Sequence, residues 1–214
     1  MKKTKKLSFL FLTLAVLFFL LGFSLNAFHR DLTELSQDQS NNERRQEPKD
    51  NEKLAREKED KERKKFIVKI APIAQEIQKE YHILPSITIA QACLESDWGR
   101  SSLSAKYNNY FGIKGGEGSD TIELKTKEFE DGHWIEKKAK FRVYRSLEES
   151  MEDHAKLLKN GTSWNNNQYQ EVLKAQDYHE ASEAMYRAGY ATDPAYATKL
   201  IKIIEKYKLN QYDK

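Results

Sequence analysis

The chain has 214 residues, a formal net charge of +3 from 36 Lys+Arg against 33 Asp+Glu, and one cysteine. Such an even balance of charge argues against a nucleic-acid-binding protein, whose basic residues would gather on one face or one helix. The single cysteine, Cys93, excludes an internal disulfide. Its apolar neighbours predict a small buried side chain and not a reactive nucleophile.

The first 28 residues predict a membrane-targeting segment. Residues 1–6 form a basic tip with four lysines, and residues 7–28 contain no charge. This uncharged run matches the ~20 residues that span a bilayer and exceeds the ~7–15 of a signal-peptide core. Because the lysines precede it, they should stay in the cytoplasm and the remainder should lie outside. We expect an uncleaved signal anchor, with a cleaved signal peptide as the alternative.

Residues 29–65 predict a charged stalk. They contain almost no apolar side chains, so they cannot bury enough surface to fold alone. The second half favours a helix, because acids precede bases at i,i+4 spacing. These pairs are Glu57–Lys61, Glu59–Arg63 and Asp60–Lys64. A coiled coil is the alternative, but no apolar a/d seam is visible.

Residues 66–214 are long enough for one globular core. A helical stripe of apolar residues begins this region, and Pro72 within it predicts either a kink or a fresh helix start. The stripe comprises Phe66, Ile70, Ile73, Ile77 and Tyr81. Ser86 is the expected N-cap of the next helix, which carries Glu95 and ends near Gly99.

The middle of this region predicts a β-hairpin, because Asp131-Gly132 separates two alternating runs. A two-residue turn there fixes the register. It pairs Ile122 with Phe141, Leu124 with Ala139, Glu128 with Ile135, Phe129 with Trp134 and Glu130 with His133. Directly opposed residues share a face of the sheet. Glu128 therefore lies on the more apolar face, Glu123 on the other, and Glu130 at the turn.

The remainder returns to helical periodicity. Ser146 and Glu149 form a capping box before a helix that Gly161 ends, and Asp193-Pro194 opens the last helix. Two short helices are expected between them, over residues 169–175 and 178–188. The fold class is therefore α+β, with several helices around one small hairpin and no internal repeat.

Glu95 lies on a helix whose apolar side chains occupy most of its circumference, so the helix should be buried on nearly all sides. Thr88, Gln91 and Glu95 form one narrow polar stripe on it. In a partly apolar cleft the pKa of Glu95 would rise, as a general acid near neutral pH requires. The alternative is a structural glutamate that caps the turn at Ser101–Ser102. Nearby aromatic and amide side chains suit a carbohydrate but are also common in cores.

Four blocks of the sequence carry a resemblance: "PSITIAQACLESDWGRSSLSAKYNNYFGIKG", "TKEFEDGHW", "FRVYRSLEESMEDHAKLL" and "AGYATDPAYATKLIKIIEKYKL". In this order they resemble the glucosaminidase domain of glycoside hydrolase family 73, which includes bacterial autolysins and a flagellar wall-cutting domain. The resemblance implies a lysozyme-like, mostly helical fold. It also implies cleavage of β-1,4 bonds in peptidoglycan after N-acetylglucosamine.

By position, the resemblance implies Glu95 as general acid, Glu128 as second carboxylate and Tyr190 as an assisting tyrosine in the cleft. Cys93 and Asp97 depart from the aliphatic and small residues usual in the first block. The candidate substrate-binding residues of these blocks are Gln91, Ser96, Trp98, Asn109, Tyr110, Phe111, Asp193 and Tyr196.

Two carboxyls could act by inversion, retention or, with a less critical Glu128, substrate assistance. The rival functions are a lytic transglycosylase, which needs one acid, and a non-catalytic wall-binding module tethered to the membrane. The five histidines lack metallopeptidase spacing such as H-E-x-x-H, so we expect no metal and no cofactor. The sequence gives no oligomeric state.

Overall fold

The computed structural model describes residues 51–116, 118, 120–130 and 132–213. The chain divides into two units, Met1–Glu59 and Asp60–Lys214. The expected anchor over residues 7–28 lies outside the described residues. Among the residues that are described, no helix is long and apolar enough to cross a bilayer.

Residues 51–81 are helical, which confirms helix in the described half of the expected stalk. The predicted Asp60–Lys64 ion pair forms at 2.7 Å. The helix is continuous through Pro72, so no fresh helix start lies there. An interior proline costs a helix about 3 kcal/mol. Burial of Ile67, Ile70 and Ile77 outweighs that cost, since each buried side chain contributes about 1.5–3 kcal/mol.

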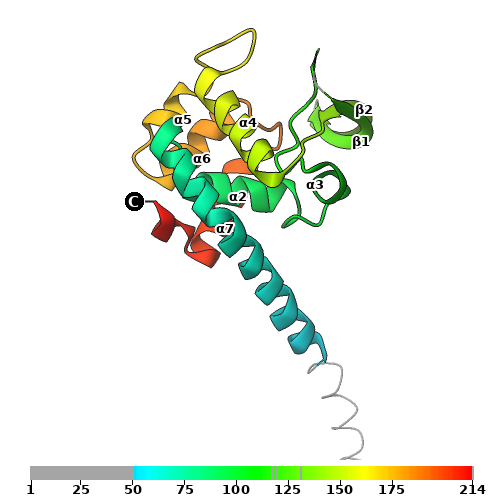
Figure 1. The fold of residues 1–214 in the computed structure, drawn as a ribbon, viewed down its shortest axis with the longest axis vertical. Helices are drawn as coiled ribbons and strands as arrows, with labels where there is room; N and C mark the ends of the chain where they lie inside the picture. Colours follow the sequence, from blue (N-terminus) through cyan, green and yellow to red (C-terminus); the bar gives the residue numbers. More distant parts are fainter. Residues whose placement is uncertain (1–50, 117, 119, 131, 214) are drawn as a thin grey trace, which may run out of the picture. The chain divides into compact units, whose positions relative to one another are not determined.

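Helix α2 (Pro85–Glu95) is buried along most of its length and contacts α6, α7 and η1 (Figure 1). Its N-terminus differs from the prediction: Leu84 is the N-cap, Pro85 is the first helical residue, and Ser86 lies inside the helix. Asp213 supplies the missing cap. Its carboxylate accepts from the Ser86 amide at 2.8 Å and from the Ser86 hydroxyl at 2.6 Å. The C-terminus of the chain therefore holds the helix that carries Glu95.

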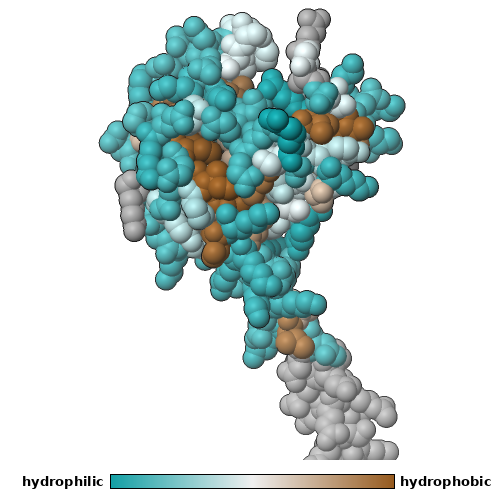
Figure 2. All heavy atoms as spheres, viewed as in Figure 1, coloured by the Kyte–Doolittle hydropathy of each residue, from teal (hydrophilic) through white to brown (hydrophobic). Residues whose placement is uncertain are grey.

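Strands β1 (Thr121–Glu130) and β2 (His133–Arg142) form a two-stranded antiparallel hairpin. The pairing agrees at every predicted position, from Ile122–Phe141 to Glu130–His133, so the register is confirmed. Asp131 itself lies outside the described residues. The face that carries Ile122 and Ile135 is half-buried, and hydrophobic surface lies over the hairpin in Figure 2. Asn109 fastens the base of β2, because its amide nitrogen donates to the Arg142 carbonyl at 2.9 Å.

The other helices complete a mostly helical body beside the hairpin, which confirms the α+β class. Ser146 accepts from the Glu149 amide at 3.2 Å, as a capping residue does, but the Glu149 carboxylate accepts from the amide of Arg145. The remaining elements are α3 (Ser102–Tyr107), α4 (Leu147–Asn160), α5 (Gln170–Lys174), α6 (Tyr178–Arg187), α7 (Tyr196–Tyr207) and η1 (Leu209–Tyr212).

Candidate active site

Glu95 is the last residue of α2, and a sharp turn directly follows it. Asp97, Trp98 and Gly99 all have positive φ, at 48°, 59° and 77°. Ser96 closes the turn, because its hydroxyl donates to the Ala92 carbonyl at 2.5 Å and accepts from the Gly99 amide at 2.7 Å. Ser96 is thus a buried structural residue. The turn ends the helix with the Glu95 side chain only partly covered.

A chain of hydrogen bonds holds the Glu95 carboxyl from behind. The Tyr196 hydroxyl donates to Glu95 Oε1 at 2.9 Å, and Gln91 Nε2 donates to that hydroxyl at 3.0 Å. Gln91 and Tyr196 are both buried. The predicted polar stripe of α2 therefore faces α7. The bond to Tyr196 favours the catalytic interpretation of Glu95 over a cap of the Ser101–Ser102 turn, since Ser101 instead caps α3.

Burial raises the pKa of Glu95 to about 7, against the lowering effects of the Tyr196 hydroxyl and the Lys199 charge. The negative charge of Asp193 raises it further. Asp193 is itself ion-paired with Lys199, which lowers the pKa of Asp193. Near neutral pH the Glu95 carboxyl is therefore divided between its acid and its anionic form. This is the condition under which a carboxyl can donate a proton.

Aromatic rings wall the site beside Glu95. Tyr190 stacks on Tyr196 with ring centroids 5.8 Å apart, and its hydroxyl donates to the Phe111 carbonyl at 3.3 Å. Phe111 in turn stacks on His154 at 3.9 Å. Burial lowers the pKa of His154 to about 3, so this imidazole is neutral. Burial first, and the Glu95 charge second, raise the pKa of Tyr190, so it keeps its proton.

Several predicted substrate-binding residues have structural roles. Asn109 is buried, and both polar atoms of its amide bond backbone groups of Ile113, at 2.9 and 3.1 Å. Tyr110 is buried and stacks on Phe66 at 6.1 Å. Trp98 packs edge-on against Tyr207 at 4.9 Å. Ser96 and Gln91 are likewise buried and hydrogen-bonded within the protein, whereas Trp98 and Asp193 are partly exposed.

The backbone of Glu128 pairs with Ile135, on the predicted hairpin face. The side chains of residues 127–130 lie outside what the structure describes. Glu128 as second carboxylate therefore stays a prediction from the register. Sequence reasoning missed Lys199, whose charge reaches Glu95, and His154 as part of the aromatic wall. The spacing of Lys199 from Asp193 gave no recognisable signal.

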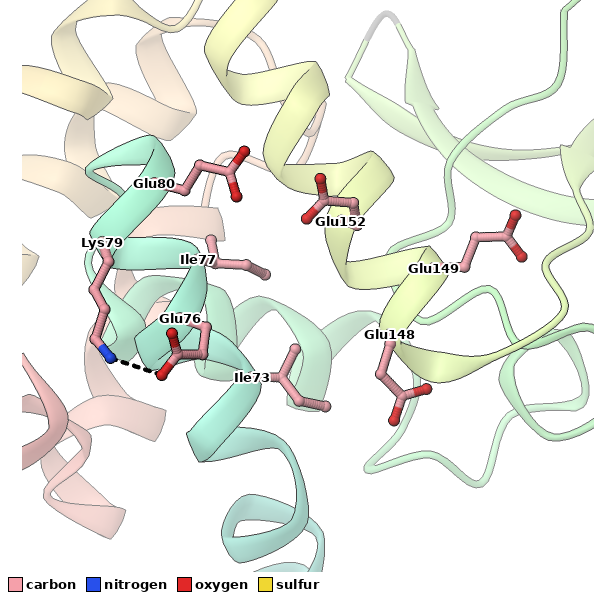
Figure 3. A pocket seen from close by; sticks show the side chains of 8 residues that line it. All are labelled: Ile73, Glu76, Ile77, Lys79, Glu80, Glu148, Glu149 and Glu152. Atoms are coloured by element: carbon pink, nitrogen blue, oxygen red, sulfur yellow. Dashed lines mark hydrogen bonds and ion pairs between the residues drawn. The ribbon is translucent and has the colours of Figure 1, made fainter.

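A separate hollow of about 550 Å³ lies between the helix over residues 51–81 and α4 (Figure 3). It contains no part of the Glu95 cluster. Its walls carry five glutamates around Ile73 and Ile77. Hydrogen bonds lower the pKa of Glu148 and Glu149, so these carboxyls are ionised at neutral pH and unsuited to proton donation. Within the described residues, no group of His, Cys, Asp and Glu side chains could hold a metal ion.

Comparison with known proteins decides the family. The sequence model of the glucosaminidase family, described as mannosyl-glycoprotein endo-beta-N-acetylglucosaminidase, matches residues 71–209. The chain belongs to the glucosaminidase family. It is 51% identical to exo-glucosaminidase LytG of Bacillus subtilis over 152 residues, 71% of this chain and 54% of that protein.

Two further relatives lie in the same family of sequences and folds. A probable N-acetylmuramidase of Lactococcus lactis subsp. cremoris is 40% identical over 151 residues, 69% of this chain and 34% of that protein. The catalytic domain of the autolysin Auto from Listeria monocytogenes superimposes with a TM-score of 0.64 at 42% identity, covering 71% of this chain and 88% of that domain. The chain spans about half the length of LytG and about a third of the Lactococcus protein.

The hydrogen bond from Tyr196 predicts a measurable effect on the titration of Glu95. Because the hydroxyl favours the carboxylate, Tyr196→Phe should raise the pKa of Glu95 above its value of about 7. Carbon-13 NMR of the glutamate δ-carboxyls would measure it. The control Tyr186→Phe, on a more exposed ring, should leave the titration unchanged. A Glu95 pKa near 4.5 in the unmodified protein would contradict the electrostatics described above.

Proposed function

We propose that this chain is a peptidoglycan hydrolase, an endo-β-N-acetylglucosaminidase that cleaves β-1,4 bonds after N-acetylglucosamine with Glu95 as proton donor. The observation that carries the proposal is the Glu95 carboxyl, which the Tyr196 hydroxyl holds and whose pKa burial raises to about 7. Membership of the glucosaminidase family supports the class of bond.

The proposed reaction follows from the state of Glu95. Its carboxyl donates a proton to the glycosidic oxygen while the bond between that oxygen and C1 breaks. The leaving sugar gains a hydroxyl, and C1 becomes oxocarbenium-like. The new Glu95 carboxylate then accepts the Tyr196 hydrogen bond and is stabilised by the charge of Lys199. These interactions are stronger in the anionic product than in the acid, so they assist proton donation.

Glu128 supplies the second carboxyl of the proposal. Its backbone pairs with Ile135, on the hairpin face that also carries Ile122, and we infer that this face is turned toward the bond that Glu95 protonates. There it accepts the proton of the attacking water or stabilises the positive charge at C1, and the separation of the two carboxyls would set inversion or retention. If the 2-acetamido group of the substrate assists, Glu128 becomes less critical.

The proposed bond specificity has a specific alternative, cleavage after N-acetylmuramic acid. Relatives of this chain include both an exo-glucosaminidase and a probable N-acetylmuramidase, and these names correspond to the two different glycosidic bonds of a strand with alternating sugars. LytG is named as an exo-enzyme, whereas the family description is of an endo-enzyme. A lytic transglycosylase would use Glu95 alone and release anhydro sugars.

We also propose that residues 7–28 anchor the protein in the cell membrane with the catalytic domain outside, or direct it to the cell wall if they are cleaved. The lysines before an uncharged run of spanning length support this. The full-length protein should pellet with membranes and be cut by protease added to intact cells. Only a shortened, soluble form in the culture medium would show that the segment is a cleaved signal.

Glu95→Gln should keep the fold and lower turnover by on the order of 10²–10⁴, because the amide cannot donate a comparable proton. The pKa of Glu95 is raised from 4.5 to about 7 in the folded state, so stability falls as the pH rises from 4.5 to about 7, and the loss is complete above that. The variant lacks this loss and should be no less stable at pH 8. Mass analysis of reducing ends released from purified peptidoglycan measures the loss. The fragments released by the wild-type enzyme should have N-acetylglucosamine at their reducing ends.

The control for this variant is Glu205→Gln, on the exposed surface of α7, which should digest walls normally. Near-normal digestion by Glu95→Gln would refute the assignment. If the fragments released by the wild-type enzyme end in N-acetylmuramic acid, the enzyme is a muramidase. If they end in anhydromuramic acid, it is a lytic transglycosylase.

Single replacements of Glu123, Glu128 and Glu130 by Gln test the second carboxyl. Because the described residues of β1 are exposed or only half-buried, stability should stay within about ±0.5 kcal/mol. Wall digestion should fall steeply for Glu128→Gln alone, because only Glu128 lies on the half-buried hairpin face away from the turn. An equal loss at Glu123 or Glu130 would mean that the wrong residue was chosen. Full activity of all three would favour substrate assistance or a single-acid mechanism.

A further inference from the structure

The most exposed large apolar side chain in the part of the chain that the structure describes belongs to Trp164, at 80% exposure. It lies in the loop over residues 161–169, which leaves the C-terminal end of α4 at the upper edge of the molecule in Figure 1 (yellow). By contrast, Trp98 packs against Tyr207 and Trp134 is 55% exposed. Exposure of so large a ring contributes nothing to the core, so its position calls for another explanation.

The loop that carries Trp164 is a tightly built turn. The backbones of Thr162 and Asn165 exchange two hydrogen bonds, at 3.0 and 3.2 Å, and the Asn167 amide donates to Asn165 Oδ1 at 3.1 Å. Gly161 enters the turn at φ 71°, and a Cβ there would lie 2.3 Å from the Asn165 carbonyl oxygen. Only glycine fits. The turn therefore presents Trp164 from a defined backbone, which reduces the entropy lost when a ligand binds.

Gln168 fastens this turn to the candidate active site. Its Oε1 accepts from the Thr162 hydroxyl at 2.7 Å, and its Nε2 donates to the Ala188 carbonyl at 2.8 Å. Ala188 lies two residues before Tyr190. The next residue, Tyr169, packs edge-on against Tyr190 with centroids 6.1 Å apart. The turn is thus continuous, through Tyr190 and Tyr196, with the side chains around Glu95.

The chemistry of the loop selects a neutral, hydroxyl-rich ligand. Residues 161–170 contain no charged side chain, in a chain that is 32% charged overall. Beside Trp164 stand the exposed amides of Asn165, Asn166 and Asn167. An indole face covers the apolar face of a sugar ring, and amides both donate to and accept from hydroxyl and acetamido groups. A phosphate or a cationic peptide would find no opposite charge here.

We propose that Trp164 is the platform of an outer subsite that binds an N-acetylated glycan strand away from the bond that is cleaved. The choice of glycan rests on the proposed function. Binding energy gained at such a remote position is the same in the ground state and in the transition state, so it tightens binding of the strand without changing turnover. Short fragments, which do not reach the turn, gain nothing from it.

Trp164→Ala tests this in two backgrounds. In the active enzyme, KM for long peptide-free glycan strands should rise on the order of tenfold, which corresponds to about 1.4 kcal/mol, with kcat unchanged. In the Glu95→Gln background, the dissociation constant for the same strands should rise equally. The N-acetylglucosamine dimer should show neither effect. Trp164→Phe should recover most of the affinity, and Trp134→Ala, on the opposite hairpin face from Glu128, should match the parent protein.

The subsite would be overturned if Trp164→Ala has an unchanged melting temperature and binds long strands with unchanged KM and dissociation constant. Equal losses for the dimer and the long strand would overturn it as well, since they would point to a general effect on the site. The two proposals can fail separately. If the unmodified protein cleaves no glycan but binds long strands, and Trp164→Ala weakens that binding, the hydrolase is refuted and the subsite is retained.

Discussion

The site depends on the balance of forces on one carboxyl. Burial at the end of α2 disfavours the anion of Glu95, while the Tyr196 hydroxyl and the Lys199 charge favour it, and the outcome is a pKa of about 7. Stronger burial without Tyr196 would leave an acid too weak to donate, and full exposure would leave an anion at neutral pH. The rest of the fold can be understood as the means of keeping Glu95 between these limits.

That balance is built from parts far apart in the chain. Tyr196 stands 101 residues after Glu95, at the first turn of α7, and packing of α7 against α2 brings the two together. The Asp213 carboxylate fixes the other end of α2 through Ser86, 127 residues away. The sharp turn after Glu95 needs the Ser96 hydroxyl to close it. A change at any of these contacts should therefore alter the acid as well as the stability of the fold.

Local rules were sufficient for some of the structure. The Asp-Gly turn and the two-residue period fixed the hairpin register completely, because one slip would turn every side chain to the other face. The stripe on α2 singled out Glu95 as a candidate, since an acid among apolar residues has few structural explanations, and the structure adds the Tyr196 hydroxyl as its hydrogen-bond donor. Capping also predicted the start of α4 at Ser146.

Tertiary contacts decided the rest. Asp213, and not Ser86, caps α2, because the C-terminus folds back onto it. Core burial carried the first helix through Pro72. Asn109 and Tyr110 have the composition of a sugar-binding site, but their partners are backbone groups and core rings that only the fold brings close. Trp164 carried no periodic signal at all; its exposure and its anchored turn became visible only in three dimensions.

The most direct test of the central claim is the pH dependence of kcat/KM on peptidoglycan glycan strands, which reports the essential groups of the free enzyme. If protonated Glu95 is the donor, kcat/KM should fall above about pH 7, in step with the loss of that proton. A kcat/KM that stays level to pH 9, or that has already fallen when the pH rises to about 5, would contradict the account.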